Sequence, residues 1–138
     1  MLLVKNAEIY APEYLGKKDL LICGGKIECI QDSIRELPVE CEVLDAEGKI
    51  LTPGFLDQHV HITGGGGEGS FHTRTPELQM SELVENGITT VVGLLGTDGI
   101  TRSVDNLYAK TRVLCEEGVS AYMLTGAYGY PSPTLTGE

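Results

Sequence analysis

The chain has 138 residues, enough for one domain, and carries 20 acidic against 10 basic side chains, for a formal net charge of −10. This acidic balance argues against partners that are themselves anionic, so we expect no binding to nucleic acid or to a membrane surface. The four cysteines lack Cys-x-x-Cys spacing and no apolar run reaches the length of a transmembrane helix, which together predict a cytoplasmic protein with reduced thiols.

In chain order, residues 1–52 predict a small β-rich domain, to which we assign no chemistry. Its strands are expected at 2–10, 20–23, 26–30, 42–45 and 49–51. Gly24-Gly25 is typical of a two-residue hairpin turn between the second and third of these strands.

The next segment, Pro53-Gly54-Phe55-Leu56-Asp57-Gln58-His59-Val60-His61-Ile62, predicts a strand over 55–62 that ends in two histidines. Because side chains alternate along a strand, His59 and His61 point to one side. The opposite side is apolar and suited to packing against helices: Leu56, Val60 and Ile62. Two neighbouring imidazoles are natural metal ligands, so we predict a metal site here, against the simpler interpretation that local hydrogen bonds satisfy both rings. Asp57 shares the histidine side one step earlier, where we expect a structural role.

The remainder alternates between helix and strand signals. A glycine-rich loop, 63–69, leads to Thr75 as an expected helix N-cap with Pro76 at the first helical position, and the helix should end at Gly87. A β-branched strand is expected at 88–95, a helix after the cap Ser103, and a strand at 120–125. This alternation predicts a parallel sheet with helical crossovers. In such folds, sites lie at the carboxyl ends of the strands.

The histidine segment carries a family resemblance. Pro53-Gly54-Phe55-Leu56-Asp57-x-His59-x-His61 resembles the opening motif of the metal-dependent amidohydrolase superfamily. The longer runs 59–68 and 73–77, with 91–98 and 123–128, resemble the isoaspartyl dipeptidase (β-aspartyl peptidase) family within it. The resemblance implies an α/β fold: the N-terminal part of a (β/α)8 TIM barrel, about three strand–helix units over 53–138, preceded by the N-terminal part of a β-sandwich domain over 1–52. Since such a barrel takes roughly 250 residues, we expect the chain to continue in a longer parent protein.

The same resemblance implies a zinc metallopeptidase that hydrolyses the isoaspartyl linkage of dipeptides by attack of metal-bound hydroxide. It implies two zinc ions per active site, bridged by a carbamylated lysine, with two more histidines and an aspartate; all of these lie outside this stretch. Because two histidines are fewer ligands than a catalytic zinc needs, residues 1–138 alone are expected to be inactive. The expected partner is a small dipeptide substrate, and the expected assembly is a homo-oligomer.

Glu68 is the residue that we expect to select the substrate. A fixed carboxylate there would pair with the free α-amino group of an isoaspartyl dipeptide; the simpler interpretation is a solvated loop acid. The resemblance implies this role for Glu68, with the backbone at Gly66 contacting the substrate. For Thr97, a turn cap and a contact to the aspartyl end of the substrate are equally open.

Tyr128 is the candidate for the reaction itself. A phenol at a strand exit can donate a hydrogen bond to an oxygen on which negative charge develops. The simpler interpretation is a half-buried packing residue. Tyr122 and Tyr130 are alternatives by position, and only the resemblance of Gly126-Ala127-Tyr128 to the family decides between them.

Two other functions stay open. The first is an amidohydrolase acting on cyclic amides or N-acyl amino acids, of the dihydroorotase, hydantoinase or deacylase type. Those substrates lack a free α-amino group, so the role of Glu68 discriminates between them and a dipeptide. The second is a truncated, non-catalytic chain that serves as a binding or assembly module.

Overall fold

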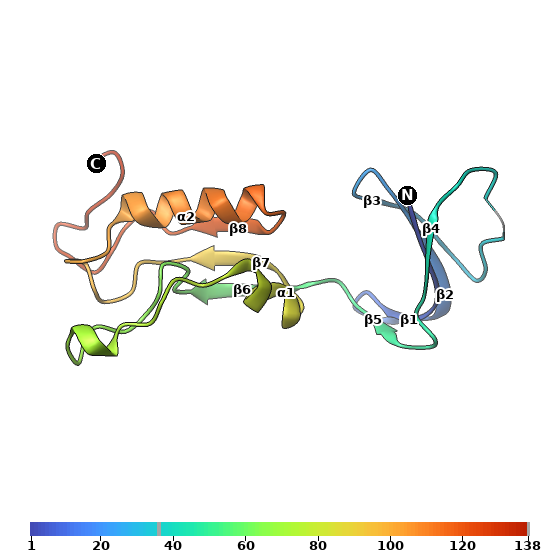
Figure 1. Cartoon of the computed structure of the whole chain (residues 1–138), viewed down its shortest axis with the longest axis horizontal. Helices are drawn as coiled ribbons and strands as arrows, with labels where there is room; N and C mark the ends of the chain where they lie inside the picture. Colours follow the sequence, from blue (N-terminus) through green and yellow to red (C-terminus); the bar gives the residue numbers. More distant parts are fainter. Residues whose placement is uncertain (36, 138) are drawn as a thin grey trace. The chain divides into compact units, whose positions relative to one another are not determined.

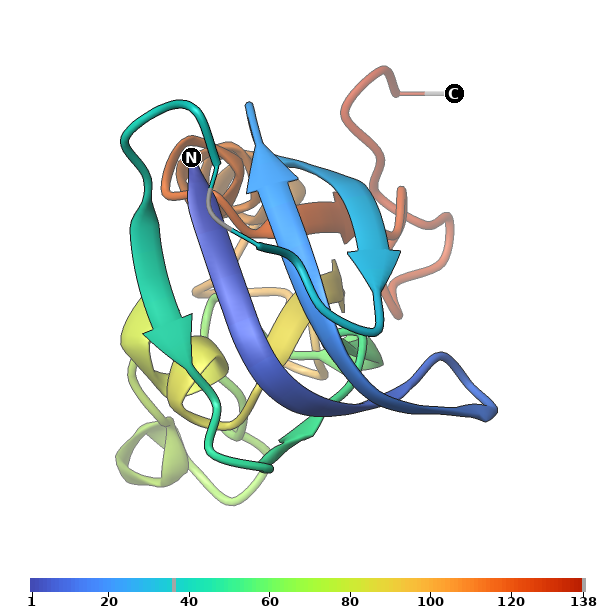
Figure 2. The same ribbon diagram turned by 90° about the vertical axis from the view of Figure 1, so that its right-hand side faces the viewer.

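The computed structural model describes residues 1–35 and 37–137 and divides the chain into two compact units, Met1–Pro53 and Gly54–Glu138 (Figure 1). The first unit is a five-stranded sheet in which β1 is central (Figure 2). Its strands are β1 (Leu2–Tyr10), β2 (Tyr14–Cys23), β3 (Lys26–Gln31), β4 (Glu42–Asp45) and β5 (Ile50–Leu51). β2 pairs antiparallel with β1 and β3, whereas β4 and β5 pair parallel with β1. All the strands expected from the sequence are present, and the hairpin turns at Gly24-Gly25, where both residues have positive φ.

One face of this sheet forms a small apolar core from Val4, Ala7, Ile9 and Leu20. Within the described residues the unit is a single sheet, so the second layer of the expected sandwich is not seen there. Several large apolar side chains of the unit are exposed: Ile27, Val43, Leu44 and Ile50.

A buried carboxylate in β2 connects β1 to the segment that follows β3. Asp19 is 3% exposed and accepts hydrogen bonds from the backbone N–H groups of Asn6 and Ile34, both at 2.9 Å. Asn6 lies at a register shift in β1 and has a φ of 57°. The carboxylate therefore satisfies a donor that the strand irregularity leaves out of the ladder.

The second unit is a parallel sheet in the order β6-β7-β8, with helices in the connections. Its elements are β6 (Phe55–Val60), the short 3-10 helix η1 (Phe71–Thr73), α1 (Met80–Glu85), β7 (Ile88–Gly93), α2 (Val104–Glu116) and β8 (Ser120–Met123). α2 runs beside β8 and β7 (Figure 1). The predicted α/β class is confirmed.

The core of this unit forms where α1 and α2 pack against the sheet. It is built from Ile62, Leu83, Val91, Leu95, Val104, Leu107, Leu114, Val119 and Ala121. Ser103 caps α2 as expected, because its Oγ accepts from the Asn106 N–H at 3.2 Å. No helix in the described part of the chain combines the length and the apolar character that crossing a membrane requires.

Several local predictions were wrong. The strand β6 ends at Val60 rather than Ile62, because the Ile62 N–H turns back to the Val60 carbonyl at 3.1 Å. The apolar side of β6 is only partly covered: Ile62 is fully buried, but Leu56 is 61% exposed. The strands β7 and β8 likewise end two residues early, at Gly93 and Met123.

The start of α1 also differs from the prediction. Thr75 is not the N-cap, since its hydroxyl instead accepts from the Gly65 N–H at 2.7 Å and is committed to the glycine loop. The helix begins only at Met80, with Gln79 as N-cap, whose N–H donates to the Glu82 carboxylate at 2.7 Å. It ends at Glu85, ahead of Gly87, whose φ of 71° breaks the helix as expected.

Candidate active site

The histidine pair lies where β6 ends. His59 is in the strand and His61 follows it directly; their ring centroids are 5.7 Å apart and the ring planes meet at 73°. Asp57 accepts the His59 N–H at 3.0 Å, so this carboxylate shapes the strand end next to the pair. Gly96, after β7, donates its N–H to His61 Nδ1 at 3.2 Å. A Cβ at Gly96 would lie 2.6 Å from that nitrogen, so only glycine allows this approach.

These two rings fit part of a metal site. Imidazole nitrogen is a good zinc ligand, but a catalytic zinc takes three protein ligands. Over residues 1–35 and 37–137, no three His, Cys, Asp or Glu side chains are grouped so as to hold a metal ion. Because His61 Nδ1 accepts a hydrogen bond from Gly96, the neutral ring has its proton on Nε2. A metal at Nδ1 would displace that hydrogen bond directly. A metal at Nε2 would move the ring proton to Nδ1, which could then no longer accept it.

The glycine loop after His61 folds back on residues 73–75. Gly64 and Gly66 have φ of 87° and 71°, a backbone region that favours glycine. An added Cβ would meet the Thr75 carbonyl at 2.3 Å from Gly64 and the Thr73 carbonyl at 2.2 Å from Gly66. These glycines are therefore required by close backbone packing as well as by conformation.

Glu68 and Thr97 come together although 29 positions separate them. The Thr97 hydroxyl donates to Glu68 Oε1 at 2.6 Å. This bond, followed by one from Glu68's own backbone N–H, lowers the pKa of the carboxyl below its ordinary value. Glu68 is therefore a fixed, ionised and exposed carboxylate at neutral pH. Thr97 therefore orients this carboxylate. The sequence had predicted either a turn cap or a substrate contact for Thr97, and neither includes this bond.

Tyr128 lines a pocket beside the histidine pair. The pocket holds about 480 Å³ and is lined by His59, Leu94, Leu95, Leu124, Thr125, Gly126, Ala127, Tyr128 and Ser132. Tyr128 is 77% exposed in this chain. Tyr122 and Tyr130 are also exposed but are not part of this lining.

Two residues at the site, Ser132 and Arg102, were not predicted from the sequence. Ser132 holds the loop of Tyr128, since its Oγ donates to the Ala127 carbonyl at 2.8 Å and accepts the Ala127 N–H at 2.9 Å. Arg102 lies beneath the glycine loop, with its side chain 4% exposed, and contacts Asp98. The available signal for Arg102 was an acid and an arginine four residues apart in the loop before α2. Most partners of Arg102 are distant in sequence and could not be predicted from it.

Comparison with known proteins supports the resemblance. No protein-family model matches the chain. Over 99% of its length the chain is 50% identical to the β-aspartyl dipeptidase of the thermophilic, keratin-degrading Fervidobacterium islandicum AW-1 in complex with the β-Asp-Leu dipeptide, with a TM-score of 0.89 and coverage of 36% of that protein. A second structure of that dipeptidase gives 51% identity, a TM-score of 0.92 and coverage of 38%.

Dihydroorotases are similar at a lower level. The one from Listeria monocytogenes serotype 4a is 35% identical over 126 residues, which are 88% of this chain and 28% of that protein. The chain thus spans roughly a third of the length of the relatives that it matches. The predicted resemblance to the amidohydrolase superfamily, and to its β-aspartyl dipeptidases over the N-terminal portion, is confirmed.

Proposed function

We propose that this stretch of an amidohydrolase is the N-terminal portion of a metallopeptidase that hydrolyses β-aspartyl dipeptides. The observation that carries this proposal is the fixed, ionised carboxylate of Glu68, held by Thr97 in the loop that follows the histidine pair. A carboxylate of this kind suits the α-ammonium group of a β-aspartyl dipeptide. Half of the chain's residues are also identical to those of a β-aspartyl dipeptidase solved with such a dipeptide.

The architecture proposed for the parent protein follows the same relatives. Residues 1–52 would begin a small β-sandwich domain, and residues 53–138 would supply about three strand–helix units of a (β/α)8 barrel. The parallel order β6-β7-β8 supports this assignment, since these strands and their helices match the relatives' N-terminal portion. We also propose a cytoplasmic homo-oligomer that does not bind nucleic acid, in keeping with four free thiols and an acidic composition.

His59 and His61 would contribute two of the ligands of a zinc site, with a carbamylated lysine and the remaining ligands supplied from beyond residue 138. Zinc bound there would supply hydroxide near neutral pH by lowering the pKa of water. Glu68 would bind the substrate's α-ammonium group, and Gly66 would contact the same end through its backbone. Thr97 would hold the aspartyl end together with Glu68. Tyr128 would donate its phenol proton in a hydrogen bond to the scissile carbonyl oxygen as negative charge develops on it.

The test is hydrolysis of β-Asp-Leu by the full-length protein that contains this chain, before and after treatment with a chelator. We expect turnover that the chelator removes and added zinc restores. Failure to cleave β-Asp-Leu with zinc present would contradict the proposal.

A second candidate is a cyclic-amide hydrolase, which the identity to dihydroorotases favours. Dihydroorotate and hydantoin, offered to the same preparation, distinguish the two because neither carries a free α-amino group. We expect β-Asp-Leu to be the better substrate by a wide margin, since Glu68 has no cation to bind in the cyclic amides.

A further inference from the structure

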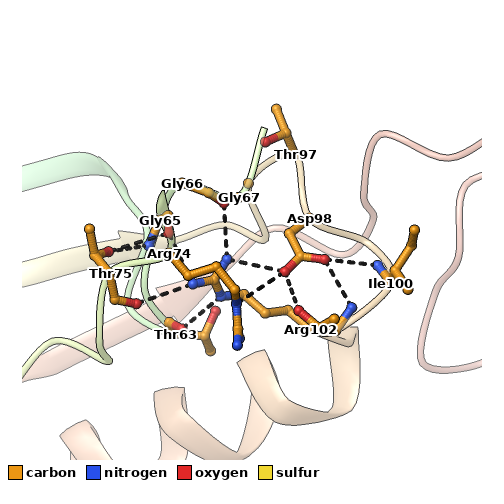
Figure 3. Close-up of polar contacts among 12 residues, drawn as sticks. Thr63, Gly65, Gly66, Gly67, Arg74, Thr75, Thr97, Asp98, Ile100 and Arg102 are labelled. Carbon is orange, nitrogen blue, oxygen red and sulfur yellow. Dashed lines mark hydrogen bonds and ion pairs between the residues drawn. The ribbon is translucent and has the colours of Figure 1, made fainter. Parts of the chain in front are cut away.

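Arg102 makes an unusually complete set of contacts beneath the glycine loop (Figure 3). Its Nε donates to the Thr63 carbonyl at 3.0 Å. Nη2 donates to the carbonyls of Gly65 at 2.9 Å and Thr75 at 3.2 Å. Nη1 donates to the Gly66 carbonyl at 3.2 Å and contacts the Asp98 carboxylate at 3.5 Å. A guanidinium has five N–H donors, so all of them are directed at protein acceptors.

The carbonyls converge on this arginine because of the glycines. With positive φ at Gly64 and Gly66, the loop packs closely on the backbone of 73–75. Both sides of the resulting loop therefore turn carbonyl oxygens toward one point. Lysine cannot replace arginine here, because an ammonium has three donors and no planar fork.

Asp98 extends the same network to the loop after β7. It contacts Arg102 and, at 3.3 Å, Arg74 Nε, and it also accepts the backbone N–H groups of Ile100 and Thr101. Hydrogen bonds from Thr101, first from its hydroxyl and then from its backbone N–H, lower the pKa of Asp98 to about 2, so it is ionised opposite both arginines.

The two loops are consequently joined at two adjacent points. Thr97 donates to Glu68. The next residue, Asp98, contacts Arg102, which holds Gly65 and Gly66. The Glu68 carboxylate is therefore held directly by Thr97, and the loop just before it is held by Arg102 through the carbonyls of Gly65 and Gly66.

We propose that Arg102 is a positioning residue for substrate recognition: it sets the glycine loop so that Glu68 and the backbone at Gly66 meet the substrate's α-ammonium end. This inference rests on the proposed function. Arg102 does not touch substrate in this scheme, because its donors are all engaged by the protein. Its substitution should therefore weaken selection for the amino group more than binding of the rest of the substrate.

The experiment compares Arg102→Lys with the wild type in the full-length protein. Arg112→Lys is the matched control, because Arg112 is exposed on α2 and the change is chemically identical. Competitive inhibition of β-Asp-Leu hydrolysis is measured with L-aspartate, which carries the α-amino group, and with succinate, which lacks it. In Arg102→Lys we expect the inhibition constant of aspartate to rise by at least about tenfold and that of succinate to change by less than about threefold. Zinc content should stay unchanged, and the control should match the wild type.

A second measurement does not depend on activity. Hydrogen exchange of the backbone amides in 63–75 should accelerate in Arg102→Lys while exchange in 104–116 is unchanged. If Arg102→Lys does not fold, Asp98→Asn replaces it in both measurements, with smaller effects in the same direction.

Equal weakening of aspartate and succinate, or no acceleration of exchange in the loop, would overturn the assignment of Arg102. An inactive wild-type protein would instead refute the proposed function, and with it the role in substrate recognition. In that case loop exchange alone still decides whether Arg102 anchors the loop.

Discussion

Replacement of Gly66 by alanine should damage the site far more than the stability of the protein. Two effects act together at this position. An L-residue at a φ of 71° is disfavoured by roughly 1–2 kcal/mol. The new Cβ would also stand 2.2 Å from the Thr73 carbonyl oxygen, well inside the 3.4 Å at which ordinary contact begins.

The overlap is with backbone, so no rotamer change relieves it and the loop must move by about 1 Å. The hydrogen bond from Arg102 to the Gly66 carbonyl is already 3.2 Å long and does not survive such a shift. A displacement of about 1 Å in a substrate-positioning segment lowers the rate by on the order of 100-fold. We therefore expect kcat/KM for β-Asp-Leu to fall by about that factor, while Tm falls by no more than about 8 °C.

The matched control is Gly99→Ala in the neighbouring loop. Its Cβ would meet nothing within 4 Å and its φ is not positive, so kinetics and Tm should match the wild type. Both variants are measured in the full-length protein by steady-state hydrolysis and thermal unfolding. If Gly66→Ala keeps its activity within about threefold of the wild type, the tight packing of this loop is not what places the substrate, and the reasoning fails.

Three further predictions follow from other parts of the structure. Glu68→Gln should lower kcat/KM for β-Asp-Leu by about 100-fold but leave zinc binding unchanged, because the α-ammonium loses its counter-charge while the histidine pair is untouched; unimpaired turnover would contradict the specificity argument. Leu114→Ala removes a fully buried side chain from the core on α2 and should lower the free energy of unfolding by about 2–5 kcal/mol in urea titrations, whereas Val113→Ala, 43% exposed, should change it by less than about 0.5 kcal/mol. Asp98, with a pKa of about 2 against an ordinary 3.8, stabilises the fold above pH 3.8, and this contribution is lost as the pH falls from there through 2. Asp98→Asn should therefore flatten the dependence of stability on pH in that acid range, and an unchanged slope would show that this carboxylate does not contribute.

Much of the fold could be predicted because its signals are local. The Gly24-Gly25 hairpin, the Ser103 cap and the β-branched strand β7 each depend on neighbours within a few positions. The start of α1 could not be predicted in this way. Thr75 has the residue type of an N-cap, but its hydroxyl is bound by Gly65, ten positions away, and only the folded loop reveals that competition.

The same distinction between local signals and contacts distant in sequence applies to the candidate site. His59 and His61 are two positions apart in the sequence, so their proximity could be predicted although the strand ends between them. Arg102 could not be found because its partners are mainly backbone carbonyls 27 to 39 positions away, which leave no trace in residue types.

The contacts of Arg102 bear on how such a site could be altered by design or by evolution. Four of its five partners are main-chain oxygens, so the contacts by which Arg102 holds the loop do not involve the side chain at position 68. Exchanging that single residue would change the charge presented to a ligand while the glycines and the arginine keep the backbone in place. A library randomised at Glu68 alone would thus vary ligand preference while the contacts of Arg102 to the loop are kept, although the hydrogen bond from Thr97 is lost or changed.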